Sequence, residues 1–331
     1  MSVRVLHGGL LTTVQDLGRF GAQKYGVIVS GAMDCVSMRL ANLLVGNEEG
    51  EGGLEVTMFG TKLYFEEDQL VAITGGDLQP TIDGRPAPMW RPVLITAGSI
   101  LQFKSAISGC RSYVAFAGGI DVPLVMGSKS TYLRAGIGGF SGRALQKGDY
   151  LACGNVTSLI GKAFSRQLKQ AHQPFSWFID YTQLQLFGQN ETIRVMPGSE
   201  FHRFSNDSRH AFFSTRYKIT TQSDRMGYRL EGVPVHVSET FDLLSEGVTY
   251  GTIQVPSSGQ PIILMADRQT TGGYPKIGQV ITADLPRLAQ MQPNTNILFT
   301  EVSLEQAEDA LFEMEKTMAD IKLSIRLKAQ F

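Results

Sequence analysis

Short runs in which hydrophobic and polar residues alternate fill most of the first 300 residues of the chain. Examples are Leu54–Thr57, Lys62–Phe65 and Leu70–Thr74, and turns rich in glycine or aspartate separate many of these runs. Alternation is typical of strands with one buried face, and short strands at close spacing favour a barrel or sandwich over a sheet of βαβ units. The pattern therefore predicts a mainly β protein with many tight turns.

A different pattern near the C-terminus predicts one long helix. Ser303 and Gln306 form a capping-box signature, in which each side chain bonds to the backbone N–H of the other residue. From Leu304 to Ile325, apolar residues recur at alternating spacings of three and four, as they do on the packed seam of a helix. We expect a helix over about 304–328, packed either against its own domain or against a partner chain.

The rest of the sequence divides into two β-rich blocks, and the second block contains an expected strand at 248–255. An early helix is predicted at 34–45, where apolar residues stop alternating, whereas residues 157–190 show no regular period and contain the expected connection between domains. We predict an N-terminal β-barrel domain with an early helix at 1–185, a second β-barrel domain at 186–301 and a C-terminal amphipathic helix at 302–331.

Bulk composition indicates a globular protein of the cytoplasm. The chain has 331 residues, enough for about two domains, with 43% hydrophobic residues, 18% charged residues and a formal net charge of −1. A nucleic-acid-binding surface would show as a clustered basic excess, which is missing, so no nucleic-acid partner is expected. The sequence contains neither a transmembrane run nor a signal peptide, so we expect a cytoplasmic protein with no membrane partner.

Motifs for metal, redox and phosphate chemistry are missing from the sequence. Cys35, Cys110 and Cys153 form no CxxC pair, so we expect free thiols, and the scattered histidines predict no metal site. The segment Gly127–Thr131 has Walker-like residue types but lacks the spacing that holds phosphates. No biotin-carrier segment with a Met-Lys-Met centre is present. The chain alone is therefore not equipped for ATP hydrolysis by a recognisable route.

Two polar segments of the first block are candidates for substrate binding. Gln15, Asp16 and Arg19 surround a glycine, where an aspartate and an arginine can face a ligand carboxylate or carbonyl. The alternative is a turn-stabilising aspartate beside a surface arginine. Ser30 and Asp34 flank the start of the early helix, a position that favours anions, although plain capping by Asp34 also accounts for this segment.

The second block carries a denser set of polar residues. The polar loop Asp267–Tyr274 follows the apolar run Ile262–Met265, which is expected to be a buried strand. A polar loop in this position favours a functional site over simple turn chemistry. Asp267 or Glu246 can act as a base or accept a hydrogen bond from an amide N–H. Gln254, Gln269 and Thr270 can orient a planar amide. The catalytic candidates are Arg225, Glu246 and Asp267, and the binding candidates of this block are Ser245, Gln254, Gln269, Thr270 and Tyr274.

Several segments of the chain match one known family in order. They are Leu11–Arg19, Val29–Asp34, Leu40–Asn47, Gly118–Pro123, Gly127–Thr131, Asp224–Leu230, Ser245–Val248, Gly251–Pro256 and Asp267–Pro275. In these segments the chain resembles the family of the 5-oxoprolinase C subunit, which is also described as KipA-like and as a biotin-dependent carboxyltransferase or allophanate hydrolase subunit 2 family. Phe20 departs from the pattern, because proline is more usual there.

The resemblance implies two cyclophilin-like β-barrel domains and an activity that requires partners. Members act with a KipI-like B subunit, joined by a LamB/YcsF-like A subunit, and the complex uses ATP and water to convert 5-oxoproline to glutamate. Biotin is not carried by this chain. For this small anionic lactam, Arg19 or Arg225 would bind the carboxylate. Gln254, Gln269 and Asp267 would bind the amide.

Two other functions are compatible with the sequence. The first is a carboxyltransferase component that acts on urea or another amide and receives its carboxyl group from a biotin carrier on a different protein. The second is a regulatory antagonist of a KipI-like kinase inhibitor, because homologous pairs in some bacteria are linked to sporulation-kinase regulation. The polar loops matter for the enzymatic functions, whereas only a partner surface matters for the regulatory one.

Overall fold

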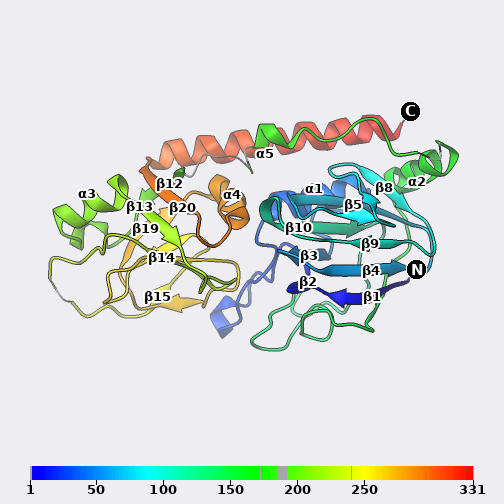
Figure 1. The fold of residues 1–331 in the computed structure, drawn as a ribbon. Coiled ribbons are helices and arrows are strands. Elements are labelled where there is room, and N and C mark those ends of the chain that lie inside the picture. Colours follow the sequence, from blue (N-terminus) through cyan, green and yellow to red (C-terminus); the bar gives the residue numbers. More distant parts are fainter. Residues whose placement is uncertain (1, 172, 185, 187–191, 240, 331) are drawn as a thin grey trace. The chain divides into compact units, whose positions relative to one another are not determined.

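The protein has the mainly β architecture predicted from its sequence, as seen in a computed structural model (Figure 1). Its strands belong to two compact units, and the second unit contains a closed β-barrel. Among the described residues, no helix is both long enough and apolar enough to cross a membrane. The structure describes residues 2–171, 173–184, 186, 192–239 and 241–330.

Neither unit is continuous in sequence. The first unit contains residues 1–19, 30–187 and 316–331, and the second contains residues 20–29 and 188–315. The segment 20–29, which we had predicted as part of the N-terminal domain, is therefore grouped with the second unit. The C-terminal helix is divided between both units. The predicted boundary at 185–186 lies beside positions that are outside the described residues.

Two antiparallel sheets form the first unit. Where the sequence predicted a barrel, the strands make two separately hydrogen-bonded sheets, in the orders β11-β1-β4-β9-β6-β7 and β2-β3-β10-β5-β8. Both sheets contribute to one apolar core. The strands are β1 (Ser2–Gly8), β2 (Leu11–Gln15), β3 (Gly53–Thr57), β4 (Thr61–Phe65), β5 (Gln69–Asp77), β6 (Thr81–Ile82), β7 (Arg85–Pro86), β8 (Pro92–Ile95), β9 (Ile100–Gln102), β10 (Ser108–Phe116) and β11 (Tyr150–Ala152).

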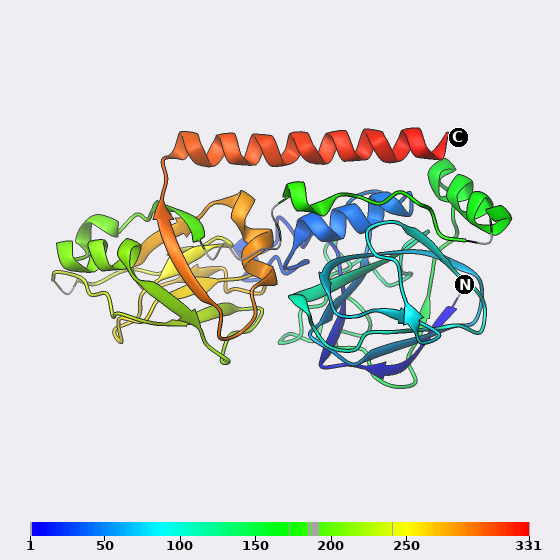
Figure 2. The ribbon, with the colours of Figure 1, turned by 45° about the horizontal axis from the view of Figure 1, so that its top comes forward.

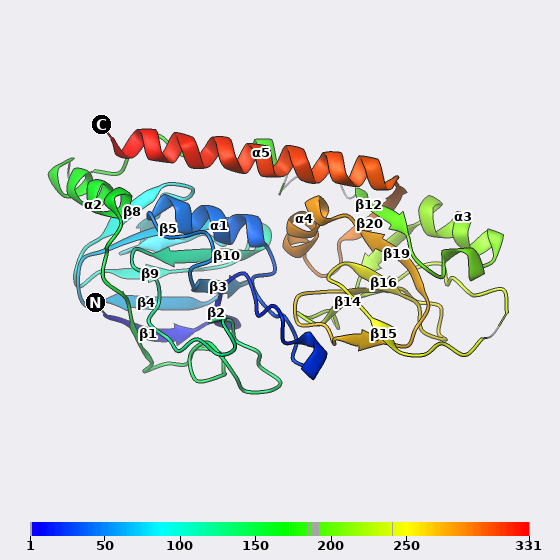
Figure 3. The same cartoon turned by 180° about the vertical axis from the view of Figure 1, so that it is seen from behind.

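Aromatic stacking joins the two sheets of the first unit. The rings of Phe65 on β4 and Phe116 on β10 lie 6.3 Å apart between centroids. The helix α1 (Cys35–Leu44) lies against β5 and β10, as seen from both sides in Figures 1 and 3. Asp34 caps this helix, because its Oδ1 accepts a hydrogen bond from the Ser37 N–H at 2.9 Å. The predicted early helix is therefore confirmed.

The second unit is a seven-stranded barrel in the order β12-β19-β16-β17-β14-β13-β20, closed by the parallel pair of β12 and β20. Phe212 stacks on Phe299 of β20, with 4.6 Å between ring centroids. Its elements are β12 (Thr192–Pro197), η3 (Phe201–Arg203), α3 (Asn206–Ser214), β13 (Arg216–Ile219), β14 (Gly227–Glu231), β15 (Glu246–Gly247), β16 (Thr252–Gln254), β17 (Ile262–Leu264), β18 (Thr271–Gly272), β19 (Lys276–Val280), η4 (Thr282–Asp284), α4 (Leu285–Gln290) and β20 (Asn296–Glu301); the segment 20–29 adds η1 (Gln23–Tyr25).

The long C-terminal helix is confirmed as α5 (Leu304–Ala329), one uninterrupted helix (Figure 2). Its capping box is also present, because the Ser303 N–H donates to Gln306 Oε1 at 2.9 Å and the Gln306 N–H donates to Ser303 Oγ at 3.2 Å. Met318 and Ile325, in the part of α5 that belongs to the first unit, are buried. This burial favours packing of the predicted apolar seam against the chain itself.

Two local predictions were wrong. The segment 157–190 contains α2 (Leu159–Ala171) and the short helix η2 (Tyr181–Leu184), which the sequence pattern did not reveal because polar residues outnumber the buried Phe164 and Leu168. The expected strand from 248 to 255 is reduced to β16. A turn precedes β16, because Gly251 has a φ of 86°, a conformation that glycine adopts without steric cost.

The capping box gives the first prediction. Replacing Ser303 by alanine should weaken the first turn of α5 by about 1 kcal/mol, because the Gln306 N–H loses its acceptor. Amide hydrogen exchange in that turn should become about fivefold faster. The control is Ser324→Ala, because Ser324 lies inside the same helix and its hydroxyl donates to the Asp320 carbonyl. Equal exchange rates in wild type and Ser303→Ala would contradict a role for the box.

Candidate functional site

In the first unit, the carboxylate of Asp16 holds the loop that contains the Walker-like segment. Asp16 lies directly after β2 and is buried. Its Oδ1 accepts hydrogen bonds from the Gly18 N–H and the Ser128 hydroxyl, each at 2.8 Å. The Ser130 hydroxyl also donates to Oδ1, and the Lys129 N–H donates to Oδ2 at 2.6 Å. These donors compensate the loss of water around the buried carboxylate of Asp16. The same hydrogen bonds fix the Walker-like segment in place.

Three other predicted residues converge on the same loop. The buried Arg19 donates from Nε to the Val125 carbonyl and from Nη2 to the Ser130 carbonyl, each at 2.8 Å. Gln15 Nε2 and Ser30 Oγ both donate to the Thr131 carbonyl, at 3.3 and 3.0 Å. The structure therefore brings Gln15, Asp16, Arg19 and Ser30 together, with these contacts directed at backbone groups of the loop.

Asp34 belongs to a second buried network in the first unit. Besides capping α1, its backbone N–H donates to the Tyr113 hydroxyl at 2.8 Å, and that hydroxyl donates to Glu55 Oε2 at 2.8 Å. Burial, followed by the nearby charge of Glu55, raises the pKa of Tyr113 well above its usual value. The phenol therefore remains a hydrogen-bond donor at neutral pH, and Asp34 takes the capping role that was one of its two interpretations.

In the second unit, Arg225 and Asp267 form a buried bidentate ion pair. Arg225 Nε contacts Oδ2 and Nη2 contacts Oδ1, both at 2.9 Å, and the two side chains are only 6% and 7% exposed. Arg225 precedes β14 and Asp267 follows β17, and the pairing of these strands brings the residues together. Beside them, burial lowers the pKa of Arg268. A bidentate pair fixes both partners, which suits positioning more than proton transfer.

A second charged cluster of this unit contains Glu246 on the two-stranded sheet β15-β18, Lys276 on barrel strand β19, and Glu200. Lys276 Nζ lies 2.6 Å from Glu246 Oε2 and 3.6 Å from Glu200 Oε2. The side chains of Lys276 and Glu200 are each 10% exposed, whereas that of Glu246 is 55% exposed. Glu246 sits on β15 opposite Gly272 of β18. The carboxylate of Glu246 is therefore exposed to solvent and forms an ion pair with the buried ammonium group of Lys276.

The strand register separates these two clusters. Gln254 is paired with both Ile262 and Lys276, so it lies in the same cross-strand row as the Lys276 cluster. Asp267 lies beyond the other end of β17. Gln254 is buried, and its Nε2 donates to the Tyr274 carbonyl at 3.4 Å. The structure thus assigns the predicted residues of the second block to opposite ends of short barrel strands.

Comparison with known proteins places the chain among carboxyltransferase domains. Residues 25–301 match the family described as carboxyltransferase domain, subdomain A and B. The chain belongs to this family. It is 40% identical to the 5-oxoprolinase C subunit of Escherichia coli, over 95% of this chain and 96% of that protein. It is 38% identical to the 5-oxoprolinase C subunit of Haemophilus influenzae, over 89% of each chain.

A solved structure gives the same result for the fold. The urea amidolyase of K. lactis matches the chain with a TM-score of 0.85 and 28% identity, over 96% of this chain. The matched part is 20% of the amidolyase, so the chain corresponds to about one-fifth of that larger protein. The carboxyltransferase-domain fold therefore occurs both as a separate chain and as part of a longer one.

The sequence did not point to every charged residue of the second unit, and several of the residues that it did predict are exposed in the structure. Lys276 and Glu200 were missed because each becomes recognisable only once the barrel pairs distant strands; the position of Lys276 just after the polar loop was the available signal. Of the remaining predicted residues, Ser245, Gln269 and Tyr274 are exposed and Thr270 is half-buried. Among the described residues, no cluster of three or more histidine, cysteine or acidic side chains is arranged to hold a metal ion.

The buried ion pair gives the second prediction. Arg225→Met and Asp267→Asn should each destabilise the protein by about 3–5 kcal/mol, because each leaves one buried charge unpaired. The double variant should lose less than the sum of the two, since neither unpaired charge remains. Equilibrium urea unfolding measures these values, with Arg229→Met as the matched control, because Arg229 is an exposed arginine of β14. Strict additivity of the two losses would show that the pair is not coupled.

Proposed function

We propose that this chain is the C subunit of an ATP-dependent 5-oxoprolinase, which acts with two partner subunits to convert 5-oxo-L-proline to L-glutamate. The observation that carries the proposal is the near-complete alignment with two proteins of that name, at 40% and 38% identity. The proposed partners are a KipI-like B subunit, joined by a LamB/YcsF-like A subunit. ATP is used by the complex, in the cytoplasm, and biotin plays no part on this chain.

Within the second unit, we propose that Glu246 is the carboxylate that contacts the lactam. It is the exposed member of its cluster, so a substrate can reach it without breaking a buried pair. A carboxylate can accept the hydrogen bond of a lactam N–H or remove its proton. The 2.6 Å contact with Lys276 fixes the orientation of Glu246. Arg225 and Asp267 then act as positioning residues that fix the ends of β14 and β17.

The first test is reconstitution of the complex. The chain is co-expressed with its two partner proteins, and ATP-dependent release of glutamate from 5-oxo-L-proline is measured while each protein is omitted in turn. We expect release to stop without this chain. Full release from the two partners alone would refute the proposal.

A second candidate function has support from the K. lactis urea amidolyase match, which spans 96% of this chain. It is carboxyl transfer to urea or another amide from biotin on a separate carrier protein. The same reconstitution distinguishes the two functions when urea and a carrier protein that already bears carboxybiotin replace 5-oxo-L-proline. Carboxylation of urea together with no glutamate release would favour this second function.

The Glu246 cluster gives a prediction for turnover in the reconstituted complex. Glu246→Gln should lower kcat by about 10²–10⁴-fold, the usual effect of removing an acid–base group. Lys276→Met should lower it through loss of orientation, Lys276→Arg should restore part of the rate, and the Glu246→Gln, Lys276→Met double variant should be no slower than Glu246→Gln. The matched control is Glu231→Gln, because Glu231 is an exposed glutamate of β14. Multiplicative losses in the double variant would show that Lys276 does not act through Glu246.

A further inference from the structure

A cavity of about 510 Å³ lies within the first unit, apart from the polar networks described above. Chain segments far apart in sequence line it: the end of β5, the segment before β8, the loop between β9 and β10, and the segment that follows α2. Its volume falls in the range of about 300–1,000 Å³ that is typical of small-molecule sites. The cavity is large enough for a ring of five or six atoms with substituents.

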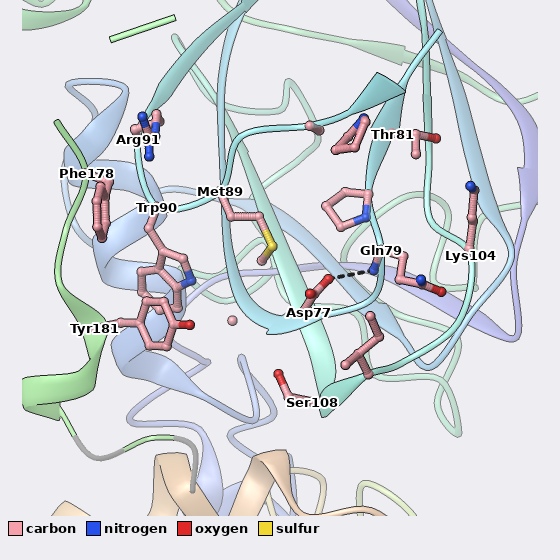
Figure 4. A pocket seen from close by; sticks show the side chains of 15 residues that line it. Asp77, Gln79, Thr81, Met89, Trp90, Arg91, Lys104, Ser108, Phe178 and Tyr181 are labelled. Carbon is pink, nitrogen blue, oxygen red and sulfur yellow. Dashed lines mark hydrogen bonds between the residues drawn. The ribbon is translucent and has the colours of Figure 1, made fainter. Parts of the chain in front are cut away.

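One side of the cavity is aromatic (Figure 4). The rings of Trp90 and Tyr181 stack with 4.8 Å between centroids and 24° between planes. The segment that carries Tyr181 is fastened to this wall, because the Ile179 N–H donates to the Trp90 carbonyl at 2.9 Å. A second hydrogen bond holds the same segment, because Arg91 Nη1 donates to the Phe175 carbonyl at 2.6 Å. The wall is therefore preformed and suits the face or edge of a planar ring.

Two residues in the lining of the same cavity have a strained backbone. Trp90 and Gln79 have φ angles of 59° and 49°, in the left-handed region that non-glycine residues rarely adopt. A bulky residue such as tryptophan adopts this conformation only when the surrounding structure enforces it. Strained residues of this kind gather at ligand sites, where the strain fixes a side chain in its binding position.

The opposite side of the cavity carries charge. Figure 4 shows Gln79 and Lys104 across the cavity from Trp90 and Tyr181, with Asp77 between the two sides. Lys104 is exposed, and among the described residues no carboxylate forms an ion pair with its ammonium group. Within the part of the chain that the structure describes, the Asp77 carboxylate accepts one hydrogen bond, from the Gln79 N–H at 2.8 Å, and keeps further acceptor capacity. The cavity thus offers a cation, an acceptor and an aromatic wall.

We propose that this cavity binds a small planar heterocycle that carries a carboxylate beside a ring N–H. The ring lies against the wall of Trp90 and Tyr181, the carboxylate pairs with Lys104, and the N–H donates to Asp77. Each group of such a ligand then meets the group that complements it, and no buried charge is left unpaired. Every residue of the site comes from this chain, and the proposal does not rest on the 5-oxoprolinase assignment.

The chain contains two tryptophans, which makes the cavity observable. Trp177 packs on Phe175 and Phe164, outside the lining of the cavity. Trp177→Phe therefore leaves Trp90 as the reporter, and its fluorescence is followed while the full-length chain is titrated with pyrrole-2-carboxylate. Calorimetry on the wild-type chain gives the same affinity independently, so a silent fluorophore cannot be mistaken for absence of binding.

Matched ligands and variants test each contact separately. Furan-2-carboxylate lacks the ring N–H and pyrrole-2-carboxamide lacks the charge, and both should bind about tenfold or more weakly than pyrrole-2-carboxylate. Asp77→Ala should remove the preference over the furan because it removes the acceptor, and Lys104→Met should remove the preference over the amide. The control Lys147→Met changes another exposed lysine and should leave every affinity unchanged.

Three results would overturn the proposal: no binding of pyrrole-2-carboxylate by either method, affinities that Lys104→Met and Asp77→Ala leave unchanged, or a preference for the puckered ring of 5-oxo-L-proline. Turnover by the reconstituted complex is a separate readout. If both proposals hold, Lys104→Met should weaken ligand binding by the full-length chain, whereas Glu246→Gln should lower turnover and leave that binding unchanged. Absence of ligand binding with normal turnover refutes only the cavity proposal, and absence of turnover with normal ligand binding refutes only the 5-oxoprolinase function.

Discussion

The cost of burying a charge without a partner governs how this protein places its polar residues. Asp16 illustrates the constraint, because its buried carboxylate is retained only with donors drawn from the loop around Ser128 and Ser130. Once those donors fix the loop, its carbonyl groups become acceptors for Arg19 and Ser30. The segment Gly127–Thr131, which has Walker-like residue types, is therefore fixed by a negative charge, whereas a phosphate would need a positive one.

The same constraint distinguishes two carboxylates of the second unit by their burial. Asp267 and Arg225 are both buried, so their attraction mainly offsets the desolvation of the two groups, and neither side chain moves without exposing the other. Glu246 bears a similar charge but is more than half exposed, so it retains hydration while Lys276 supplies the buried cation. Two carboxylates that look equivalent in sequence thus differ in what they can do, and burial is the cause.

Local patterns predicted much of this fold. The caps at Asp34 and Ser303 marked two helix starts because capping depends on residues three positions apart. Helix α2 was missed because only a narrow stripe around Phe164 is buried, and the polar residues on its other faces hid the period. The grouping of site residues was only partly predictable. Lys276 meets Glu200 through contacts between positions far apart in sequence, which no local pattern contains.

Polar groups that are hydrogen-bonded inside the protein support the fold, whereas polar groups that are exposed to solvent are available to a ligand. The networks of Asp16 and Arg225 set the positions of loops and strand ends, so they support any chemistry that the fold carries. This agrees with a scaffold that also forms one-fifth of the K. lactis urea amidolyase chain. Selectivity for a ligand must then come from groups that keep unused bonding capacity. The two proposed ligand contacts, Glu246 for the lactam and Lys104 for the cavity ligand, are both exposed groups of this kind.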